Sequence, residues 1–227
     1  MTRAYRPIAK LEENLWTVDG DLPLPGGVFD RKMTLMRLRD GRIVIHSAIL
    51  LDESDMNEIE RWGEPAFCIV PNRRHRMDAP AFRGRYPALC MVCPAGARER
   101  IERVTSVDGG YEILPPELQW RTLATKDDEA AFIFRNRDRG TIVFGDVVFN
   151  APHFGGALGW IFKTIGSTGG PRVTPLMKLA AVADRLQLAS QLREQAGTEG
   201  LVRLVPGHGH NIEDNPGEVL SRVADGI

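Results

Sequence analysis

An apolar run that stops abruptly at a proline, before a loop of charged side chains, constrains the fold of this chain most. Residues 66–70 read Ala-Phe-Cys-Ile-Val, and Pro71 ends the run. The polar segment that follows, 72–78, contains His75, Asp78 and three arginines. α/β folds carry functional side chains in this way, on loops beyond the carboxyl ends of buried strands. The sequence therefore predicts a strand at 66–70 with a functional loop at its end.

Apolar runs of strand length recur along the rest of the chain, separated by turn signals such as Gly20, Pro25-Gly26-Gly27 and Asp40-Gly41. The spacing of apolar residues and the turn-forming residues that flank them predict strands at 15–20, 32–38, 42–49, 87–94, 111–114, 118–123, 130–135, 141–149 and 201–205. Helices are predicted at 52–61, 95–104, 177–195 and 216–224. Each half begins with meandering strands and ends with strand–helix units. This rhythm predicts two sheets packed together with helices outside, in one domain spanning residues 1–227.

The overall charge of the chain is balanced, with 29 basic and 30 acidic residues and a net charge of −1. We therefore expect no nucleic acid and no membrane as partner, whereas the clustered arginines suit an anionic small molecule. The amino-terminal residues lack the apolar core of a signal peptide, and no apolar run approaches ~20 residues. An odd number of cysteines, 3, fits a reducing compartment, so a cytoplasmic location is expected.

Histidines lie at or near the ends of the predicted strands. Four of them have this placement: His46, His75, His208 and His210. His153 lies in a glycine-rich stretch, and Asp146 directly follows a glycine within a predicted strand. Imidazole and carboxylate groups gathered at one sheet edge suit zinc, iron or manganese. The alternative for each single histidine is a partly exposed polar side chain without a ligand.

Two motifs in the second half resemble those of a known superfamily. Residues 144–149 (Phe-Gly-Asp-Val-Val-Phe) resemble the strand that carries the bridging aspartate of the metallo-β-lactamase-like hydrolases. Residues 204–209 (Leu-Val-Pro-Gly-His-Gly) resemble the setting of their last metal-binding histidine. The similarity runs from about Leu15 to the end of the chain. It implies an α/β (α+β) fold, a four-layer αββα sandwich of two mixed β-sheets flanked by helices.

The first half departs from the motifs of this superfamily. Its His-x-His-x-Asp-His loop would follow the strand at 66–70, where only His75 matches a histidine and Asp78 stands near the aspartate or last histidine. Residues 123–129, where a further histidine is usual, contain none. His46-Ser47 replaces the usual aspartate at the end of an early strand. The chain thus resembles a degenerate branch of unknown function with an incomplete metal-binding loop.

The resemblance implies a reduced site with one divalent metal ion, zinc foremost, or none if the site has degenerated. His75, Asp146 and His208 are the expected ligands, with Asp146 also catalytic. Asp78 would orient water or act as a base. His46, Asp78 and His210 are candidates for additional metal ligands. Four residues are expected to bind substrate: Arg73, Arg74, Arg76 and His153. The three arginines would either clamp an anionic group or occupy the space of a lost metal ion.

These residues predict a metal-dependent hydrolase in which activated water attacks an ester, amide, lactone or phosphodiester of an anionic small molecule. The alternative is a non-catalytic protein whose arginine-lined pocket binds an anionic ligand or a protein partner. A flavin-linked di-iron oxidoreductase is disfavoured, because two irons need more ligands than the sequence offers. The apolar residues Trp160, Phe162 and Ile165 are expected either to be buried under the long helix or to form a homodimer patch. Cys90 and Cys93 are expected in the core.

Overall fold

The structure is a computed structural model, and it describes residues 3–24 and 27–227. The predicted turn at Pro25-Gly26 lies outside the described residues. Two compact units make up the chain: Met1–Asp21 with Lys32–Glu117, and Leu22–Arg31 with Leu118–Ile227. Strands β2 (Leu15–Leu24) and β3 (Gly27–Arg37) each run from one unit into the other.

The first unit is built on a six-stranded mixed sheet, in the order β1-β2-β3-β4-β5-β6. The additional strands are β1 (Ala9–Glu12), β4 (Arg42–His46), β5 (Glu64–Ile69) and β6 (Cys90–Val92). β4 pairs antiparallel with β3, while β4, β5 and β6 are parallel. Parallel neighbours need crossover connections, which here contain α1 (Glu53–Trp62) and α2 (Ala79–Arg85). α3 (Ala95–Glu102) follows β6.

The core of the first unit forms where these helices pack on the sheet. Met56 and Ile59 of α1, Phe82 of α2 and Ile101 of α3 are fully buried in one cluster with the strand residues Ile45 and Met91. The apolar strand predicted at 66–70 is confirmed as β5, paired on both sides. A strand covered on both edges and buried by helices reads as a continuous apolar run, as observed in the sequence.

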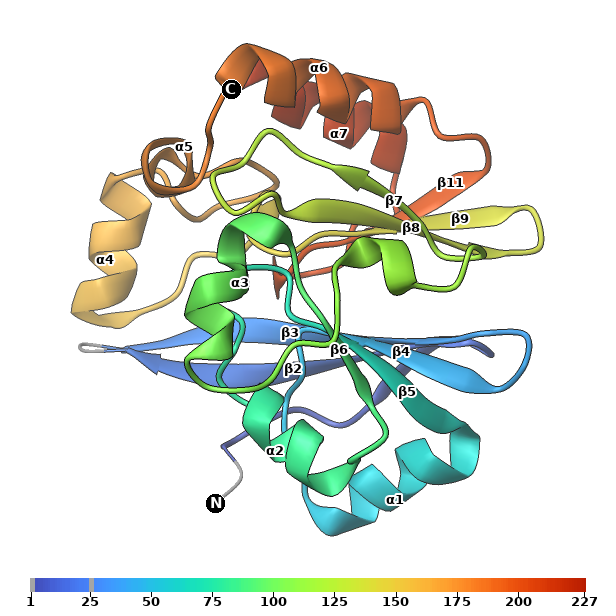
Figure 1. Cartoon of the computed structure of the whole chain (residues 1–227). Helices are drawn as coiled ribbons and strands as arrows, with labels where there is room; N and C mark the ends of the chain where they lie inside the picture. The colour runs from blue at the N-terminus through green and yellow to red at the C-terminus, as the bar shows by residue number, and fades with distance from the viewer. Residues whose placement is uncertain (1–2, 25–26) are drawn as a thin grey trace. The chain divides into compact units, whose positions relative to one another are not determined.

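The second unit carries a four-stranded mixed sheet, in the order β11-β9-β8-β7. Its strands are β7 (Gln119–Thr122), β8 (Ala130–Asn136), β9 (Arg139–Val143) and β11 (Leu201–Val205). A short parallel pair, β10 (Phe149–Asn150) and β12 (His208–Gly209), continues beyond β9 and β11. The helices are α4 (Gly156–Thr164), α5 (Pro175–Ala180), α6 (Arg185–Ala196) and α7 (Pro216–Asp225). α6 and α7 lie side by side over this sheet (Figure 1).

The long helix predicted at 177–195 is wrong, because the chain breaks between α5 and α6. Val182 forms an antiparallel bridge with Thr125, which takes the chain out of helical geometry. Asp184 then caps the new helix, its carboxylate accepting a hydrogen bond of 3.0 Å from the Gln187 amide. Leu179 and Leu186, which supplied the helical period, are exposed.

Smaller corrections concern local chemistry that periodicity does not detect. Gly20 lies inside β2 and makes no turn; a Cβ there would lie 3.1 Å from Ile49 Cδ1, so glycine allows close packing. The strand predicted at 111–114 is a 3₁₀ helix, Tyr111–Ile113. α2 and α4 were not predicted. Two mixed sheets flanked by helices nevertheless confirm the predicted α/β class.

No helix within the described ranges combines the length and the apolar character needed to cross a bilayer.

Candidate metal centre

Asp146 lies where β9 gives way to β10. The strand predicted at 141–149 is interrupted there by a bend at Gly145–Val147, so the Asp146 side chain leaves the pleated alternation of the sheet. Its backbone amide donates a 2.8 Å hydrogen bond to Oε1 of the buried Glu129. The Glu129 amide in turn donates to Thr125 Oγ1 at 2.8 Å. These contacts hold the Asp146 backbone in place with buried polar groups.

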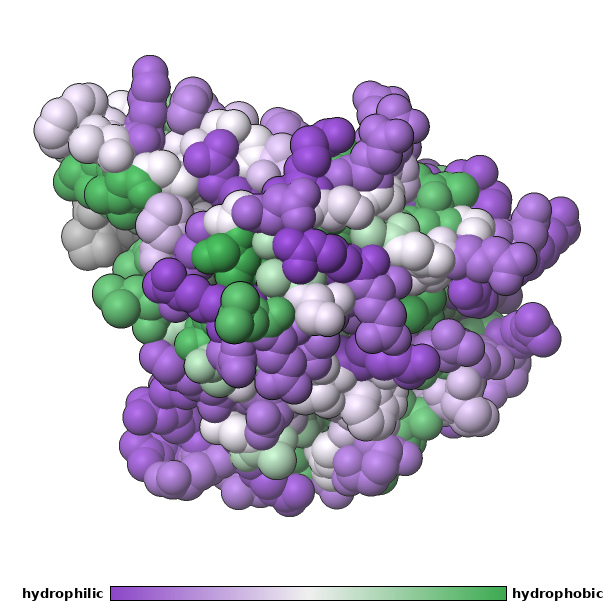
Figure 2. Space-filling model, turned by 90° about the horizontal axis from the view of Figure 1, so that it is seen from above, coloured by the Kyte–Doolittle hydropathy of each residue, from purple (hydrophilic) through white to green (hydrophobic). Residues whose placement is uncertain are grey.

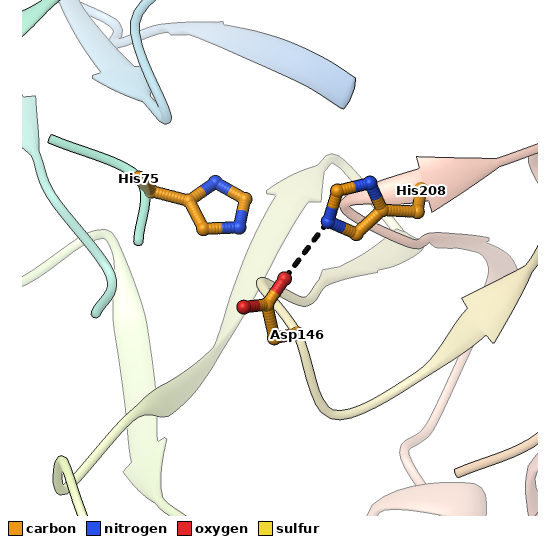
Figure 3. Close-up of side chains that lie close together, drawn as sticks. All are labelled: His75, Asp146 and His208. Atoms are coloured by element: carbon orange, nitrogen blue, oxygen red, sulfur yellow. Dashed lines mark hydrogen bonds and ion pairs between the residues drawn. The ribbon is translucent and has the colours of Figure 1, made fainter. Parts of the chain in front are cut away.

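His208 begins β12 and is anchored through one ring nitrogen. Its Nδ1 hydrogen-bonds the backbone carbonyl oxygen of Asp30, and because a carbonyl only accepts, Nδ1 carries the proton. Nε2 lies 2.9 Å from Asp146 Oδ1, and both side chains are buried (Figure 3). The carboxylate of Asp30 also accepts the amide of Gly209. One residue thus orients both the ring and the backbone that follows it.

The contact between His208 and Asp146 brings two acceptors together. With Nδ1 protonated, a neutral imidazole presents a lone pair at Nε2, and the Asp146 carboxylate presents another. A proton or a cation must therefore lie between them. Burial lowers the pKa of His208, but the hydrogen bond and charge of Asp146 and the contacts with Asp30 outweigh it, so the pKa is raised. The pair is arranged to attract positive charge.

Aromatic rings surround His208 within the second unit. The Phe149 ring stacks on the imidazole at 4.7 Å between centroids and an interplanar angle of 14°, and the Phe29 ring lies 5.0 Å away. Phe29 also contacts Phe154 and Phe162 at 6.0 and 5.5 Å. Rings packed on the imidazole exclude water from it and fix its plane, which strengthens its electrostatic interaction with Asp146.

Glycines allow the two motif-bearing segments to lie against each other. A Cβ at Gly207 would clash with the carbonyl oxygen of Gly145. The same oxygen accepts a hydrogen bond of 3.2 Å from the Gly207 amide. Gly209 has φ of 86°, and a Cβ there would clash with the Asn150 backbone. Close backbone approach and a left-handed conformation both favour glycine.

His75 belongs to the first unit, in the loop after β5. Its Nδ1 hydrogen-bonds Ser47 Oγ, and its amide donates to the Asn72 carbonyl at 3.3 Å. Ser47 follows β4 with φ of 60°, an unusual conformation for a serine. The Asn72 side chain accepts the Arg74 amide at 2.9 Å and so shapes the loop. Ser47 thus fixes the His75 ring by its Nδ1 edge.

Asp78 starts α2, and its carboxylate has partners in the first unit. Oδ2 accepts the Leu50 amide at 3.2 Å, and Oδ1 lies 3.2 Å from Arg3 Nη1. These bonds tie the loop to the segment after β4. His46 is buried at the end of β4, where it pairs with Ile69 of β5. The ligand or base roles of Asp78 and His46 stay predictions.

The predicted substrate-binding residues have different surroundings. The Arg76 guanidinium donates to the Arg100 carbonyl in the last turn of α3, an interaction that stabilises a helix end. Arg73 is half-buried and Arg74 is exposed. His153 is exposed, with Nδ1 2.9 Å from Thr168 Oγ1.

His210, predicted as an additional ligand, is exposed and is joined to Asn150 through its backbone. Three supporting residues are not marked by the sequence: Asp30, Ser47 and Glu129. Asp30 is 178 positions from His208 and carries no motif. Glu129 lies in the stretch 123–129, which contains no histidine. Ser47 replaces part of a motif, and only the folded chain reveals its hydrogen bond with His75.

No protein-family model matches the chain, and no curated protein matches it significantly. Solved structures do match across all of it. Among them are VMB-1, with a TM-score of 0.68 and 10% identity over 99% of that chain, and the DIM-1 metallo-β-lactamase, with 0.64 and 10% over 99%. The metallo-β-lactamase FIM-1 from Pseudomonas aeruginosa, in its mono-zinc form, matches with 0.65 and 10% over 97%. Each alignment covers 100% of the present chain.

These similarities confirm the fold that the motifs around Asp146 and His208 imply. The chain has the metallo-β-lactamase fold.

Proposed function

We propose that the protein is a metal-dependent hydrolase with a reduced, one-metal site formed by His75, Asp146 and His208. The observation that carries the proposal is the contact of His208 Nε2 with Asp146 Oδ1, two acceptors that need a positive charge between them. A divalent cation meets that need. The fold supports the same conclusion, because FIM-1, one of the solved structures with this fold, is described in a mono-zinc form.

The donor set fits a borderline metal. Metal-binding histidines ordinarily donate their second ring nitrogen to a carbonyl, carboxylate or water, which fixes the ring and its tautomer. Asp30 plays that part for His208 Nδ1, and Ser47 is placed to play it for His75 Nδ1. Both histidines would then offer Nε2. Two imidazoles and one carboxylate, with a fourth position open to water, match catalytic zinc sites.

The cation, zinc foremost with iron or manganese as alternatives, would supply Lewis acidity and lower the pKa of a bound water. In this proposal the chain's own residues orient substrate and handle protons. Asp146 would accept a hydrogen bond from the attacking water, and Asp78 would orient it or act as base. Arg73 and Arg74 would bind the substrate's anionic group by charge-assisted hydrogen bonds. Arg76 and His153 would also contribute to substrate binding.

The proposed substrate is an anionic small molecule with an ester, amide, lactone or phosphodiester bond. We also propose that the protein is located in the cytoplasm. The free thiols of Cys68, Cys90 and Cys93 are consistent with a reducing compartment.

Metal content tests the proposal directly. Protein purified without chelator is analysed by inductively coupled plasma mass spectrometry, together with the variants Asp146→Ala, His208→Ala and His75→Ala. His210→Ala is the matched control, because that exposed histidine lies two residues from His208 but is not part of the cluster of His75, Asp146 and His208 that could hold the ion. We expect near-stoichiometric metal in the wild type and the control, and little in the three variants. Metal-free wild type whose melting temperature is unchanged by added zinc, iron or manganese would refute the site.

A second function is favoured by the arginines of the loop 72–78. In a non-catalytic protein, Arg73 and Arg74 would hold an anionic ligand or an acidic protein partner without metal. Stabilisation by phosphate or a carboxylate that survives the His208→Ala substitution, in metal-free protein, would support this function. Stabilisation that depends on metal would support the hydrolase.

A further inference from the structure

One helix of the second unit exposes apolar side chains that a folded chain ordinarily buries. In α4, Trp160 is 69% exposed and Ile161 is also exposed, as is Ile165 directly after the helix. α5 adds Leu176 and Leu179, the latter 74% exposed. The prediction that the apolar residues of α4 are buried under the long helix is therefore wrong for Trp160 and Ile165. We call these five residues, with the basic residues between them, the α4–α5 face.

The opposite side of α4 is already used for packing. Phe162 lies 5.5 Å from the Phe29 ring and 5.9 Å from the Phe154 ring, measured between centroids. A Cβ at Gly159 would clash with the Phe154 backbone, so α4 approaches the preceding loop closely there. α4 thus packs against the unit through Phe162 and Gly159, and the side chains of Trp160 and Ile161 are exposed.

Arg172 holds together the turn between α4 and α5, which brings the end of α4 next to the start of α5. Its guanidinium donates to the carbonyls of Gly166 at 3.0 Å and Gly169 at 2.9 Å. A Cβ at Gly166, just after α4, would lie 3.8 Å from Pro175 Cγ, at the start of α5. Figure 2 shows hydrophobic side chains at the surface on its left, the side on which α4 lies in Figure 1, next to hydrophilic ones.

The charge of this segment departs from that of the whole chain. Residues 147–183 contain no aspartate or glutamate, although the chain has 30 acidic residues, and they include Lys163, Arg172 and Lys178. Burial, and then the charges of Arg185 and Arg172, lower the pKa of Lys178. The face therefore combines exposed Trp, Ile and Leu side chains with basic residues from a stretch of sequence that has no acidic side chain.

We propose that the α4–α5 face docks onto an anionic phospholipid surface. Interfacial helices bind in this way, with apolar side chains inserted among acyl chains and with Lys or Arg at the head groups. Tryptophan favours that interface because its ring is amphipathic. The balanced charge of the whole chain predicted no membrane partner, and the proposal depends on the local departure from that balance. It does not depend on the proposed hydrolase activity.

Two other occupants fit the face less well. A two-fold dimer through α4 would place Lys163 and Lys178 opposite the same cations of a second copy, and like charges repel across an interface. An acidic protein partner would satisfy the charges but would also need a surface shaped to receive Trp160 and Leu179. A bilayer is fluid, and it accommodates separate apolar side chains without a complementary groove.

Vesicle co-sedimentation tests the proposal with the full chain. We expect binding to vesicles of equimolar phosphatidylcholine and phosphatidylglycerol, and at least about tenfold weaker binding to phosphatidylcholine alone. Trp160→Ala should weaken binding by about tenfold, since binding scales with the apolar area inserted. Lys163→Glu should weaken it by at least as much. Val104→Ser, which removes an exposed apolar side chain of the first unit, and Arg121→Glu, which makes the same change of charge on β7, should bind like wild type.

Circular dichroism confirms that each variant is folded before its binding is compared. Absence of binding to the anionic vesicles would refute the proposal, as would binding that Trp160→Ala and Lys163→Glu leave unchanged. A concentration-dependent dimer that Trp160→Ala abolishes, without vesicle binding, would identify a second copy as the occupant instead. Binding to soluble polyglutamate but not to vesicles would point to an acidic protein partner and would equally overturn the proposal.

Discussion

His208 Nε2 and Asp146 Oδ1 lie 2.9 Å apart in a buried contact, although 62 positions separate them in the sequence. Two folding events produce it: β11 pairs parallel with β9, and the chain then continues as β12 beside β10. Since Nδ1 of His208 is committed to the Asp30 carbonyl, only a proton or a cation reconciles the two facing acceptors. The predictions for the site follow from this contact.

The first prediction concerns pH. In chelator-treated protein the raised pKa of His208 means that its protonated form is stabilised by folding. That contribution is fully present below the unfolded value of about 6.5 and is lost as pH rises through the folded pKa. Urea unfolding should therefore show stability falling across this interval. In Asp146→Asn the decrease should be smaller, because the charge that raises the pKa is gone. An NMR titration of the His208 imidazole that gives an ordinary or lowered pKa would contradict the assignment.

Metal uptake should depend on pH in the opposite sense. A cation can replace the proton at His208 Nε2 only when the proton leaves, so binding releases protons and tightens as pH rises. Isothermal titration of chelator-treated protein with zinc in two buffers of different ionisation enthalpy measures the protons released. His210→Ala should release as many as wild type. Equal heats in both buffers would show that no proton is displaced.

Ser47 is predicted to act through His75. Ser47→Ala removes the hydroxyl that contacts His75 Nδ1, so the ring loses its orientation. Loss of such a supporting contact typically lowers metal affinity by about 10–100-fold. Ser47→Thr keeps the hydroxyl but adds a branched side chain at a φ of 60°. Comparing the two variants therefore distinguishes an effect of backbone strain at residue 47 from the effect of losing the hydrogen bond. If Ser47→Ala binds zinc as tightly as wild type, His75 is not a ligand held by Ser47.

Glu129 is predicted to hold the Asp146 backbone. Glu129→Ala leaves the buried Asp146 amide without the carboxylate it donates to, which should cost about 1–3 kcal/mol of unfolding free energy. Glu129→Gln retains an oxygen acceptor and should lose less. Chemical denaturation of both variants measures the difference. Equal losses would show that hydrogen bonding to the Asp146 amide is not what Glu129 contributes.

Glycine substitutions provide a test of the backbone packing. Gly209→Ala places a Cβ against the Asn150 backbone at a left-handed φ, and it should destabilise the protein by at least about 1–3 kcal/mol. Gly155→Ala is the matched control, because no atom lies within 4 Å of a Cβ there. The control should unfold within about 0.5 kcal/mol of wild type. Comparable stability of the two variants in thermal unfolding would contradict the packing described for β12.

The sequence was most informative where local pattern and tertiary role agree. The bounds of β11, Leu201–Val205, were predicted without error, because the buried strand ends at a proline and glycine. The motifs also identified Asp146 and His208, which the structure brings together. The helix predicted at 177–195 failed because Leu179 and Leu186 keep the helical period but face outward.

Supporting residues could not be found from the sequence, for a physical reason. Asp30 contributes a backbone carbonyl to His208 and a carboxylate to the Gly209 amide, and both partners are distant in the sequence, so no local pattern marks it. Glu129 acts through an amide of Asp146, and its role depends on the pairing of β8 with β9. Such contacts are consequences of tertiary structure and become visible only when the chain is folded.

The close approach of Gly207 to the Gly145 backbone has a consequence for how sequences of this kind are interpreted. Gly207 and Gly209, on either side of His208, are needed because a Cβ at either position would clash with another backbone segment, whatever side chains stand next to them. A descendant that abandoned catalysis would still be obliged to keep these two glycines to remain folded. The Pro-Gly-His-Gly signature therefore reports ancestry and architecture. Whether such a protein is an enzyme has to be judged from the imidazoles and carboxylates that accompany the signature.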